Sequence, residues 1–401
     1  MSEAASNAGD EVSLPTVPYG EDYPEIRRSI QAICKDFPGE YWRDQESRKE
    51  HAAEFTAAMT ESGYLSALIP EEYGGAGLPL RAGGVIFEEI SAAGCSASNI
   101  RAQMYMMKML IKHGTQAQKD KYLPGISSGK LRFQSFGVTE PTTGSDTLNL
   151  KTRAVRDGDH YVVNGQKIWT SRALNSDLMT LLVRTTPVNE RAQRTDGLSV
   201  LLVDIRDSVG KGMTIRPIET MVNHQTNEIF YDNLRVPVEN LIGVENKGFR
   251  IILDGMNSER ILVAHESLGD CRYFIDKAVK YANDRVVFGH PIGKNQGIQF
   301  PIARAYAQYK AADLMVRTAA ALFDAGLPCG EQANMARLLS SEAAWASGEE
   351  CMQTHGGYSM AREYDIERKW RGARIQRIAP ISTNLILAYI GHNVLGLPKS
   401  Y

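Results

Sequence analysis

The sequence predicts an α+β multidomain protein, with an all-α N-terminal domain, a central antiparallel β barrel or sandwich, and a C-terminal domain like a four-helix bundle. Apolar residues recur every three or four positions in the first and last parts of the chain, which is typical of helices that bury one face. Between these parts, short alternating or β-branched runs separated by turn residues indicate strands. We therefore expect domains at residues 22–130, 131–243 and 244–401.

Length, charge and cysteine usage narrow the class of protein. The 401 residues, 43% of them hydrophobic, are enough for two or three buried cores. A net charge of −2 does not indicate the basic surface that nucleic-acid binding needs. No apolar run approaches membrane-spanning length. The five cysteines form no C-x-x-C pair, which favours a reducing compartment and no metal site. Residues 1–21 lack the basic and apolar regions of a signal peptide, so we expect a disordered tail and a cytoplasmic protein.

The first domain is expected to contain four helices. The apolar spacing places them at about 23–37, 49–63, 84–94 and 97–113. The last of them carries four methionines, which most often fill a core. Met104 and Met107 are the two that could line a pocket instead. Arg101, just before them, is expected to be solvated or to cap the helix.

The remaining elements follow from the change of hydrophobic period. Strands are expected at 131–139, 160–171, 178–184, 197–205, 213–219 and 227–231. Helices are then expected at about 247–284, 296–325 and 330–355, with a last one after about 381. The chain has no internal repeat and no G-x-G-x-x-G dinucleotide fingerprint.

The segment from Phe136 to Asp146 follows the first expected strand and has an unusual composition. It supplies threonines, a proline and a Gly-Ser turn, and therefore small hydroxyls and backbone N–H groups rather than bulk. A planar polar ring or a phosphate could lie against such a surface. Composition alone also permits a plain loop between two strands.

The same segment resembles the flavin-and-substrate loop of acyl-CoA dehydrogenases, usually aromatic-x-x-Thr/Ser-Glu-Pro-x-x-Gly-Ser-Asp. The resemblance implies FAD as cofactor and an acyl-CoA thioester as substrate. It also implies that Ser145 contacts the pantetheine arm of the substrate. The implied flavin contacts in this loop are Phe136, Val138, Thr139, Gly144 and Ser145.

A second segment, Asn164 to Ser171, resembles the family's Asn-Gly-x-Lys-x-Trp-Ile-Thr motif. A broad indole ring can stack on a flavin, which gives Trp169 a role, and a hydroxyl after it can reach the flavin N5 edge. The resemblance assigns cofactor contacts to Trp169, Thr170 and Ser171. Without the resemblance, the segment predicts a hairpin turn at Asn164-Gly165 with a tryptophan in the core, and both interpretations can hold together.

Two further motifs of the family lie in the C-terminal helices. Arg285-x-x-Phe288-Gly with Gln296 resembles the segment that reaches the FAD pyrophosphate and adenine of a neighbouring subunit, and an arginine suits pyrophosphate because its fork donates two hydrogen bonds. Gln353-x-x-Gly356-Gly357 resembles a second cofactor contact. Read alone, these residues would be a C-terminal charge cap and a helix C-cap. The resemblance implies a homodimer or homotetramer.

The catalytic base is expected at Glu259. Ile252, Met256, Glu259 and Val263 share one helix face, so the carboxylate projects from an apolar stripe where burial would raise its pKa toward that of a base poised near neutral pH. The run Asn257-Ser258-Glu259-Arg260 also resembles isovaleryl-CoA and long-chain acyl-CoA dehydrogenases, which place the base on this helix. The alternative is a solvated glutamate at the edge of the stripe. Asn257 and Arg260 are expected to contact the substrate, Arg260 through its CoA part.

The chain departs from the family near its C-terminus. Pro380 stands where many members carry the base, and it lacks the N–H that often binds the thioester carbonyl, a donor typically worth about 3–4 kcal/mol. Ile381 replaces a glycine beside the acyl group, and both residues are expected near the substrate. Ser382 keeps a hydroxyl beside the flavin, while Asn384 replaces a glutamate that commonly binds FAD.

Together these resemblances imply FAD-dependent α,β-dehydrogenation of an acyl-CoA to the 2-enoyl-CoA, with electrons passed to an electron-transfer flavoprotein. Two alternatives remain at this stage. The first is an acyl-CoA oxidase or another flavin reaction on the same scaffold. The second, motivated by Pro380, is a flavin- or acyl-CoA-binding protein with little turnover.

Overall fold

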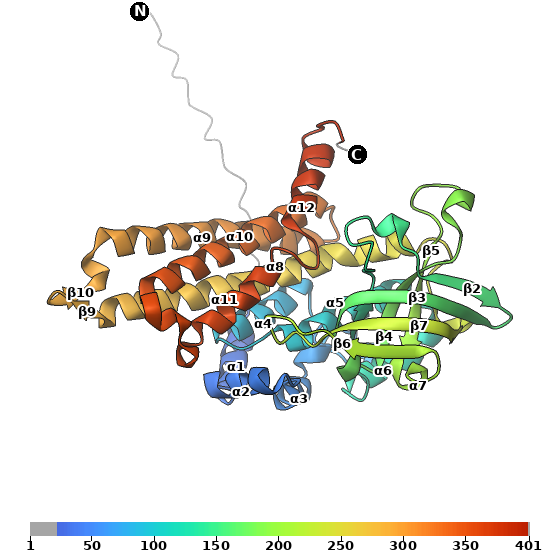
Figure 1. The fold of residues 1–401 in the computed structure, drawn as a ribbon, viewed down its shortest axis with the longest axis horizontal. Helices are drawn as coiled ribbons and strands as arrows, with labels where there is room; N and C mark the ends of the chain where they lie inside the picture. Colours follow the sequence, from blue (N-terminus) through green and yellow to red (C-terminus); the bar gives the residue numbers. More distant parts are fainter. Residues whose placement is uncertain (1–21, 400–401) are drawn as a thin grey trace, which may run out of the picture.

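The computed structural model describes residues 22–399 and arranges them as helical, β and helical parts in chain order (Figure 1). The tail expected at residues 1–21 lies outside the described residues. The N-terminal helices pack beneath the long C-terminal helices, and the sheet lies at one end of both. Along the described chain, no helix is both long and apolar enough to cross a membrane.

From residue 22 onward, where the structure describes the chain, the N-terminal part contains six α-helices, two more than expected. They are α1 Pro24–Lys35, α2 Gly39–Arg48, α3 Ala53–Glu61, α4 Leu80–Ala92, α5 Ser98–His113 and α6 Gln116–Ser127. The four expected helices are confirmed, while α2 and α6 were missed. For α6 the signal was present: the Thr115 hydroxyl accepts from the Gln118 N–H at 3.2 Å, and the Thr115 N–H donates to the Gln118 side chain at 3.0 Å. This reciprocal pair is a capping box, which marks a helix start.

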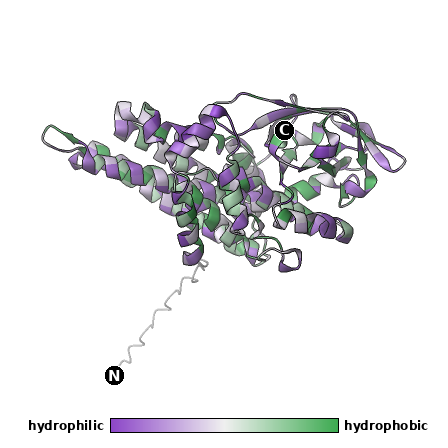
Figure 2. Ribbon diagram, turned by 90° about the horizontal axis from the view of Figure 1, so that it is seen from below, coloured by the Kyte–Doolittle hydropathy of each residue, from purple (hydrophilic) through white to green (hydrophobic). Residues whose placement is uncertain are grey.

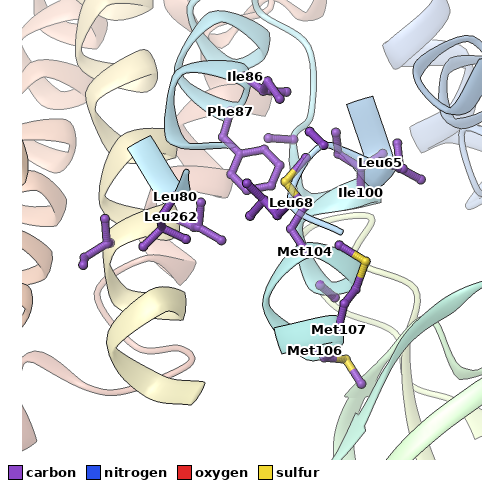
Figure 3. Packing of buried hydrophobic residues seen from close by; sticks show 14 of the residues in the cluster. Leu65, Leu68, Leu80, Ile86, Phe87, Ile100, Met104, Met106, Met107 and Leu262 are labelled. Atoms are coloured by element: carbon purple, nitrogen blue, oxygen red, sulfur yellow. The ribbon is translucent and has the colours of Figure 1, made fainter. Parts of the chain in front are cut away.

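The methionines of α5 pack into the main hydrophobic core with residues from α3 to α8 (Figure 3). Met104 and Met107 are fully buried there. The suggestion that these two side chains line a pocket was therefore wrong, and core filling accounts for them. The same core continues into α8, α9 and α10, so the first and last parts of the chain fold against each other.

Strands of the central part form one sheet in the order β6-β7-β3-β2-β4-β5-β8, with β1 beside β4. Their bounds are β1 Phe133–Gly137, β2 Arg153–Asp157, β3 His160–Ser171, β4 Leu178–Arg184, β5 Leu198–Asp204, β6 Met213–Pro217, β7 Thr226–Pro237 and β8 Leu241–Ile242. A short α7, Ile205–Ser208, follows β5. All six expected strands are present, and β2 and β8 were missed.

Most strand pairs are antiparallel, as expected, with two exceptions. β1 runs parallel to β4, and β2 meets β4 in parallel through the single pair Arg153–Arg184. This pair joins two halves of the sheet, and apolar side chains from both halves pack into one cluster. The halves therefore cover each other's apolar faces, as in a sandwich. β3 is continuous through Asn164 and Gly165, so the prediction of a hairpin turn there was wrong.

The C-terminal part is built on α8, Gly248–Asp284, which runs from the sheet to the far end of the molecule (Figure 1). The other helices are α9 Gln296–Asp324, α10 Gly330–His355, α11 Ile366–Ile375 and α12 Thr383–Tyr389, and a small hairpin, β9 Val286–Val287 with β10 His290–Pro291, caps the far end. Hydrophobic and hydrophilic residues mix along these helices, as expected where one face is buried (Figure 2). Of these helices, only α11 was missed.

Candidate functional site

A cavity of about 360 Å³ lies where α5, the sheet, the first half of α8 and the segment before α12 meet. It collects residues that are far apart in the sequence, including most of those expected to carry chemistry. The predicted residues that line it are Phe136, Val138, Thr139, Gly144, Ser145, Trp169, Ser171, Glu259, Arg260, Pro380 and Ile381. Among the described residues, no group of three or more His, Cys, Asp or Glu side chains could hold a metal ion.

The loop after β1 is clamped to β3 by a buried lysine. Lys167 Nζ donates to the Val138 carbonyl and to Glu140 Oε1, both at 2.9 Å, and the Ile168 N–H donates to the Thr139 carbonyl at 2.9 Å. Glu140 also accepts from the N–H groups of Lys151 and Thr152, at 2.6 and 2.8 Å. The two segments expected to bind one cofactor are thus held as one surface.

Trp169 is turned out of the β3 ladder rather than into the core. Its φ of 61° is left-handed, and the pairing of β3 with β7 shifts register between Lys167 and Thr170. The indole is 58% exposed and lines the cavity, so the alternative of a core tryptophan is wrong. A strained residue that presents a flat ring to a cavity suits stacking on a planar ligand. The Thr170 hydroxyl, by contrast, is buried and lies outside the cavity lining.

Glu259 lies on the cavity wall formed by α8 and is only 4% exposed. Burial raises the pKa of its carboxyl to about 7, while the charges of Arg101 and Arg260 act in the opposite direction. The carboxyl is therefore poised to lose and regain a proton near neutral pH. Beside it, Arg260 Nη1 donates to Asn257 Oδ1 at 3.1 Å, so Asn257 fixes Arg260 and does not itself line the cavity.

Several cavity residues were not expected from the sequence. Arg101 is neither solvated nor a cap, because it forms a largely buried ion pair with Glu266 of α8. Tyr105 follows it by one turn of α5, and that spacing could have revealed the shared face. Arg172 comes directly after Trp169-Thr170-Ser171, while His224 lies in the loop before β7 and carried no local signal.

The segment before α12 closes another side of the cavity. Pro380 and Ile381 line it, and buried Arg337 donates through Nη2 to the Ala379 carbonyl at 3.1 Å, which holds the segment in place. Ser382 is not among the lining residues because it caps α12, where its hydroxyl accepts from the Leu385 N–H at 3.3 Å. Asn384 is exposed and also lies outside the lining.

The remaining predicted cofactor residues gather elsewhere. Arg285, Gln353, Gly356 and Gly357 line an open hollow of about 550 Å³ at the far end of α8. Arg285 caps the end of this helix and lies about 39 Å from Glu259 along the helix axis. Glu259 and Arg285 of one chain therefore cannot contact the same atoms of a bound ligand. The Arg285 guanidinium lies 5.7 Å from the ring centre of Tyr358. Phe288, three residues after Arg285 in the chain, is 97% exposed. Gln296, the first residue of α9, is also exposed.

Three family models match this chain. They are described as the N-terminal, middle and C-terminal domains of acyl-CoA dehydrogenases and match residues 20–130, 135–234 and 246–394, respectively. Together they span the helical, β and helical parts of the fold.

Individual proteins show the same likeness. The chain is 32% identical over 384 residues to the acyl-CoA dehydrogenase FadE12 of Mycobacterium tuberculosis, across 95% of this chain and 98% of that protein. The glutaryl-coenzyme A dehydrogenase in complex with glutaryl-CoA has a TM-score of 0.88 at 28% identity, across 95% and 97% of the two chains. A chain in the structure described as the electron transferring flavoprotein of Acidaminococcus fermentans has a TM-score of 0.87 at 29% identity, across 94% and 98% of the two chains.

Proposed function

This chain belongs to the acyl-CoA dehydrogenase family of oxidoreductases, and we propose that it uses Glu259 as the base that removes the α-proton of an acyl-CoA thioester. One observation carries the proposal: the Glu259 carboxyl, buried and with a pKa raised to about 7, shares a cavity with the 136–145 loop and Trp169. We propose the same placement of the base as in isovaleryl-CoA and long-chain members, which the run Asn257-Ser258-Glu259-Arg260 resembles. We also propose domains at 22–130, 131–243 and 244–401.

The cofactor of the proposed reaction is FAD, and the residues present fit its flavin. Trp169 offers an exposed indole, the loop at Phe136 to Ser145 offers backbone and small hydroxyls, and a Cβ added at Gly144 would meet nothing within 4 Å. Ser171 adds a hydroxyl to the same cavity. When bound there, the flavin supplies the acceptor for the β-hydrogen of the substrate.

The chain itself supplies proton transfer and positioning. Glu259 takes the α-proton, and its desolvated site makes the carboxylate a stronger base than it would be in water. Arg260, fixed by Asn257, presents positive charge at the cavity for the CoA part of the substrate. Ser145 offers its hydroxyl to the pantetheine arm.

The hollow at Arg285 receives the adenine and pyrophosphate part of FAD from a neighbouring subunit. Arg285, which lines this hollow, lies about 39 Å from Glu259 along α8. This separation supports the assignment, because α8 keeps the two sites of one chain apart. Gln353, Gly356 and Gly357 line the hollow with Arg285. Large apolar side chains are exposed on the C-terminal part of the chain and would be covered in such a homodimer or homotetramer: Phe288, Phe300, Tyr306, Leu314, Leu387 and Leu395.

A second candidate function comes from Pro380. It lines the cavity at a position where it can donate no hydrogen bond to the thioester carbonyl, and losing such a donor typically costs about 3–4 kcal/mol of transition-state stabilisation. A protein that binds acyl-CoA and flavin with little turnover would show the same feature. Such a protein would still give ligand-induced changes in the flavin spectrum.

Anaerobic flavin bleaching tests the proposal. The FAD-loaded protein is mixed with a panel of straight, branched and cyclic acyl-CoAs without oxygen, and bleaching by at least one of them supports dehydrogenation. Spectral shifts without bleaching across the panel would instead support the binding protein. We propose an electron-transfer flavoprotein as the acceptor, and rapid oxygen consumption without an added acceptor would favour an oxidase.

A further inference from the structure

Arg172 is a buried cation that faces the cavity without a carboxylate of its own. The side chain is 2% exposed, and Nη2 donates to Ser98 Oγ at 2.9 Å. Its Nε has no hydrogen-bond partner, and no carboxylate among the described residues forms an ion pair with it. Burying an unpaired charge is costly, so a structure keeps one where a ligand supplies the partner.

The backbone fixes this arginine in a strained conformation. Arg172 has a left-handed φ of 56°, and its N–H donates to the Gln225 carbonyl at 2.7 Å. Non-glycine residues in this region of φ and ψ are held by their surroundings and concentrate at ligand sites. The surrounding fold therefore fixes the backbone of Arg172, which is one of the residues that line the cavity.

The groups around Arg172 leave an excess of positive charge. The charges of Arg101 and Glu266 both act on Arg172, but Glu266 already forms an ion pair with Arg101. Burial lowers the pKa of Arg172 to about 9, so the guanidinium is still protonated at neutral pH. Burial also holds the pKa of His224 well below its usual range and raises that of Tyr105, so neither contributes a charge there.

The cavity has an apolar side and a polar end. The start of α8 contributes Phe249, Ile252, Leu253 and Met256, whereas Arg101, Arg172 and His224 form the polar end. Beyond Arg101 and His224, a smaller cavity of about 90 Å³ is lined by Glu266, Asp270 and Lys369, among others. An unsubstituted hydrocarbon chain that reached this end would meet charged groups and leave Arg172 without a partner.

We propose that the acyl group this enzyme accepts carries a carboxylate at the end remote from the thioester, and that Arg172 binds it, with Arg101 alongside. This inference rests on the proposed function and narrows its substrate class. A guanidinium suits the role because its fork can donate two parallel hydrogen bonds to one carboxylate. Ser98 holds Arg172 through a hydrogen bond, and Glu266 holds Arg101 through an ion pair.

The test compares thioesters of equal length with and without the remote carboxylate. The FAD-loaded enzyme is mixed anaerobically with glutaryl-CoA against pentanoyl-CoA, and with adipyl-CoA against hexanoyl-CoA, and kcat/KM for bleaching and Kd are measured. Wild type should prefer the carboxylated member of at least one pair, and Arg172→Met should lower that preference at least about 30-fold. Arg172→Lys should restore part of it, and Arg153→Met, on exposed β2, should leave it unchanged.

Each other outcome has a definite meaning. If wild type reacted equally well with the carboxylated and the uncarboxylated thioester of each pair, the inference would be overturned, but the proposed dehydrogenation would still hold. So would an Arg172→Met variant that slows every thioester equally or loses FAD, because Arg172 would then serve the cofactor. If no thioester bleaches the flavin, the proposed function fails; tighter binding of the carboxylated members that disappears in Arg172→Met would still support the subsite.

Discussion

Lys167 Nζ lies 2.9 Å from Glu140 Oε1, and this buried ion pair joins the two segments that form the cofactor side of the cavity. Both side chains are almost completely buried. Burial lowers the pKa of Lys167 to about 8, while the attraction of Glu140 opposes that shift. Each of the two charges therefore needs the other, because either one alone would be an unpaired charge in a low-dielectric site.

Lys167→Met should destabilise the protein by about 3–5 kcal/mol, since it leaves the Glu140 carboxylate buried without its cation. Urea unfolding measures the change. Adding Glu140→Gln to this variant should recover part of the loss. Lys121→Met removes an exposed pair with Glu239 at 3.3 Å and should cost no more than about 1 kcal/mol. A similar small loss for Lys167→Met would show that the clamp contributes little.

Glu259→Gln should keep FAD and lower the rate of anaerobic bleaching by at least 10²–10⁴-fold, roughly the contribution of a positioned general base. Stopped-flow absorbance of the flavin follows the rate. Glu61→Gln, an exposed change of the same kind on α3, should bleach like wild type. Bleaching by Glu259→Gln at the wild-type rate would assign the base elsewhere.

The pH dependence of bleaching should follow the same carboxyl. A base must be deprotonated, so kcat/KM should rise with pH, reach half its maximum near pH 7 and level off above it, because the pKa of Glu259 is raised to about 7. A profile that is flat from about pH 5 to about pH 9, roughly two units on either side of the pKa of Glu259, would contradict this assignment.

Stability should change in the opposite direction over the same range. Because the folded pKa is raised above its usual value of about 4.5, the contribution of Glu259 is complete below pH 4.5 and is lost as pH rises through about 7. Relative to Glu259→Gln, wild type should therefore lose on the order of 3 kcal/mol between these pH values. Urea unfolding of both proteins across this pH range gives the difference.

Trp169→Ala should weaken FAD binding about 10-fold while leaving the stability of the FAD-free protein within about 0.5 kcal/mol, because the indole is exposed. Trp169→Phe should keep most of the affinity. Fluorescence titration with FAD and urea unfolding separate the two effects. Trp42→Ala provides the contrast, since that buried indole should cost about 3–5 kcal/mol on removal. Unchanged FAD affinity in Trp169→Ala would exclude stacking.

Phe288→Asp should dissociate the proposed assembly and weaken FAD binding. The ring is 97% exposed in one chain, and aspartate tolerates the left-handed φ of 54° at this position. Light scattering gives the mass, and flavin absorbance gives the FAD content. Val155→Asp adds the same charge to an exposed position of β2 and should change neither. A full-size, FAD-loaded Phe288→Asp protein would place the interface elsewhere.

Most of the fold could be predicted because its strongest signals are local. Apolar periodicity located α1, α3, α4, α5 and α8 to α10, and alternating β-branched runs located the main strands. The helices α2 and α11 were missed because each has only 10 residues, fewer than the stretch over which periodicity can be recognised, and many of them are charged. The parallel pairing of β1 with β4 was missed because no local pattern encodes which strand lies beside which.

The sequence by itself determined the family, the order of the parts and the helix face that carries Glu259, because motif spacing and periodicity are properties of one segment at a time. Tertiary structure decided what surrounds that carboxyl. Arg101 looked like a solvated residue, yet an ion pair with Glu266, far away in the chain, buries it beside the cavity. Arg172 and Trp169 point into the cavity because their left-handed backbone is imposed by neighbouring strands. Burial and partners at long range set charge and pKa, and these arise only when the chain is folded.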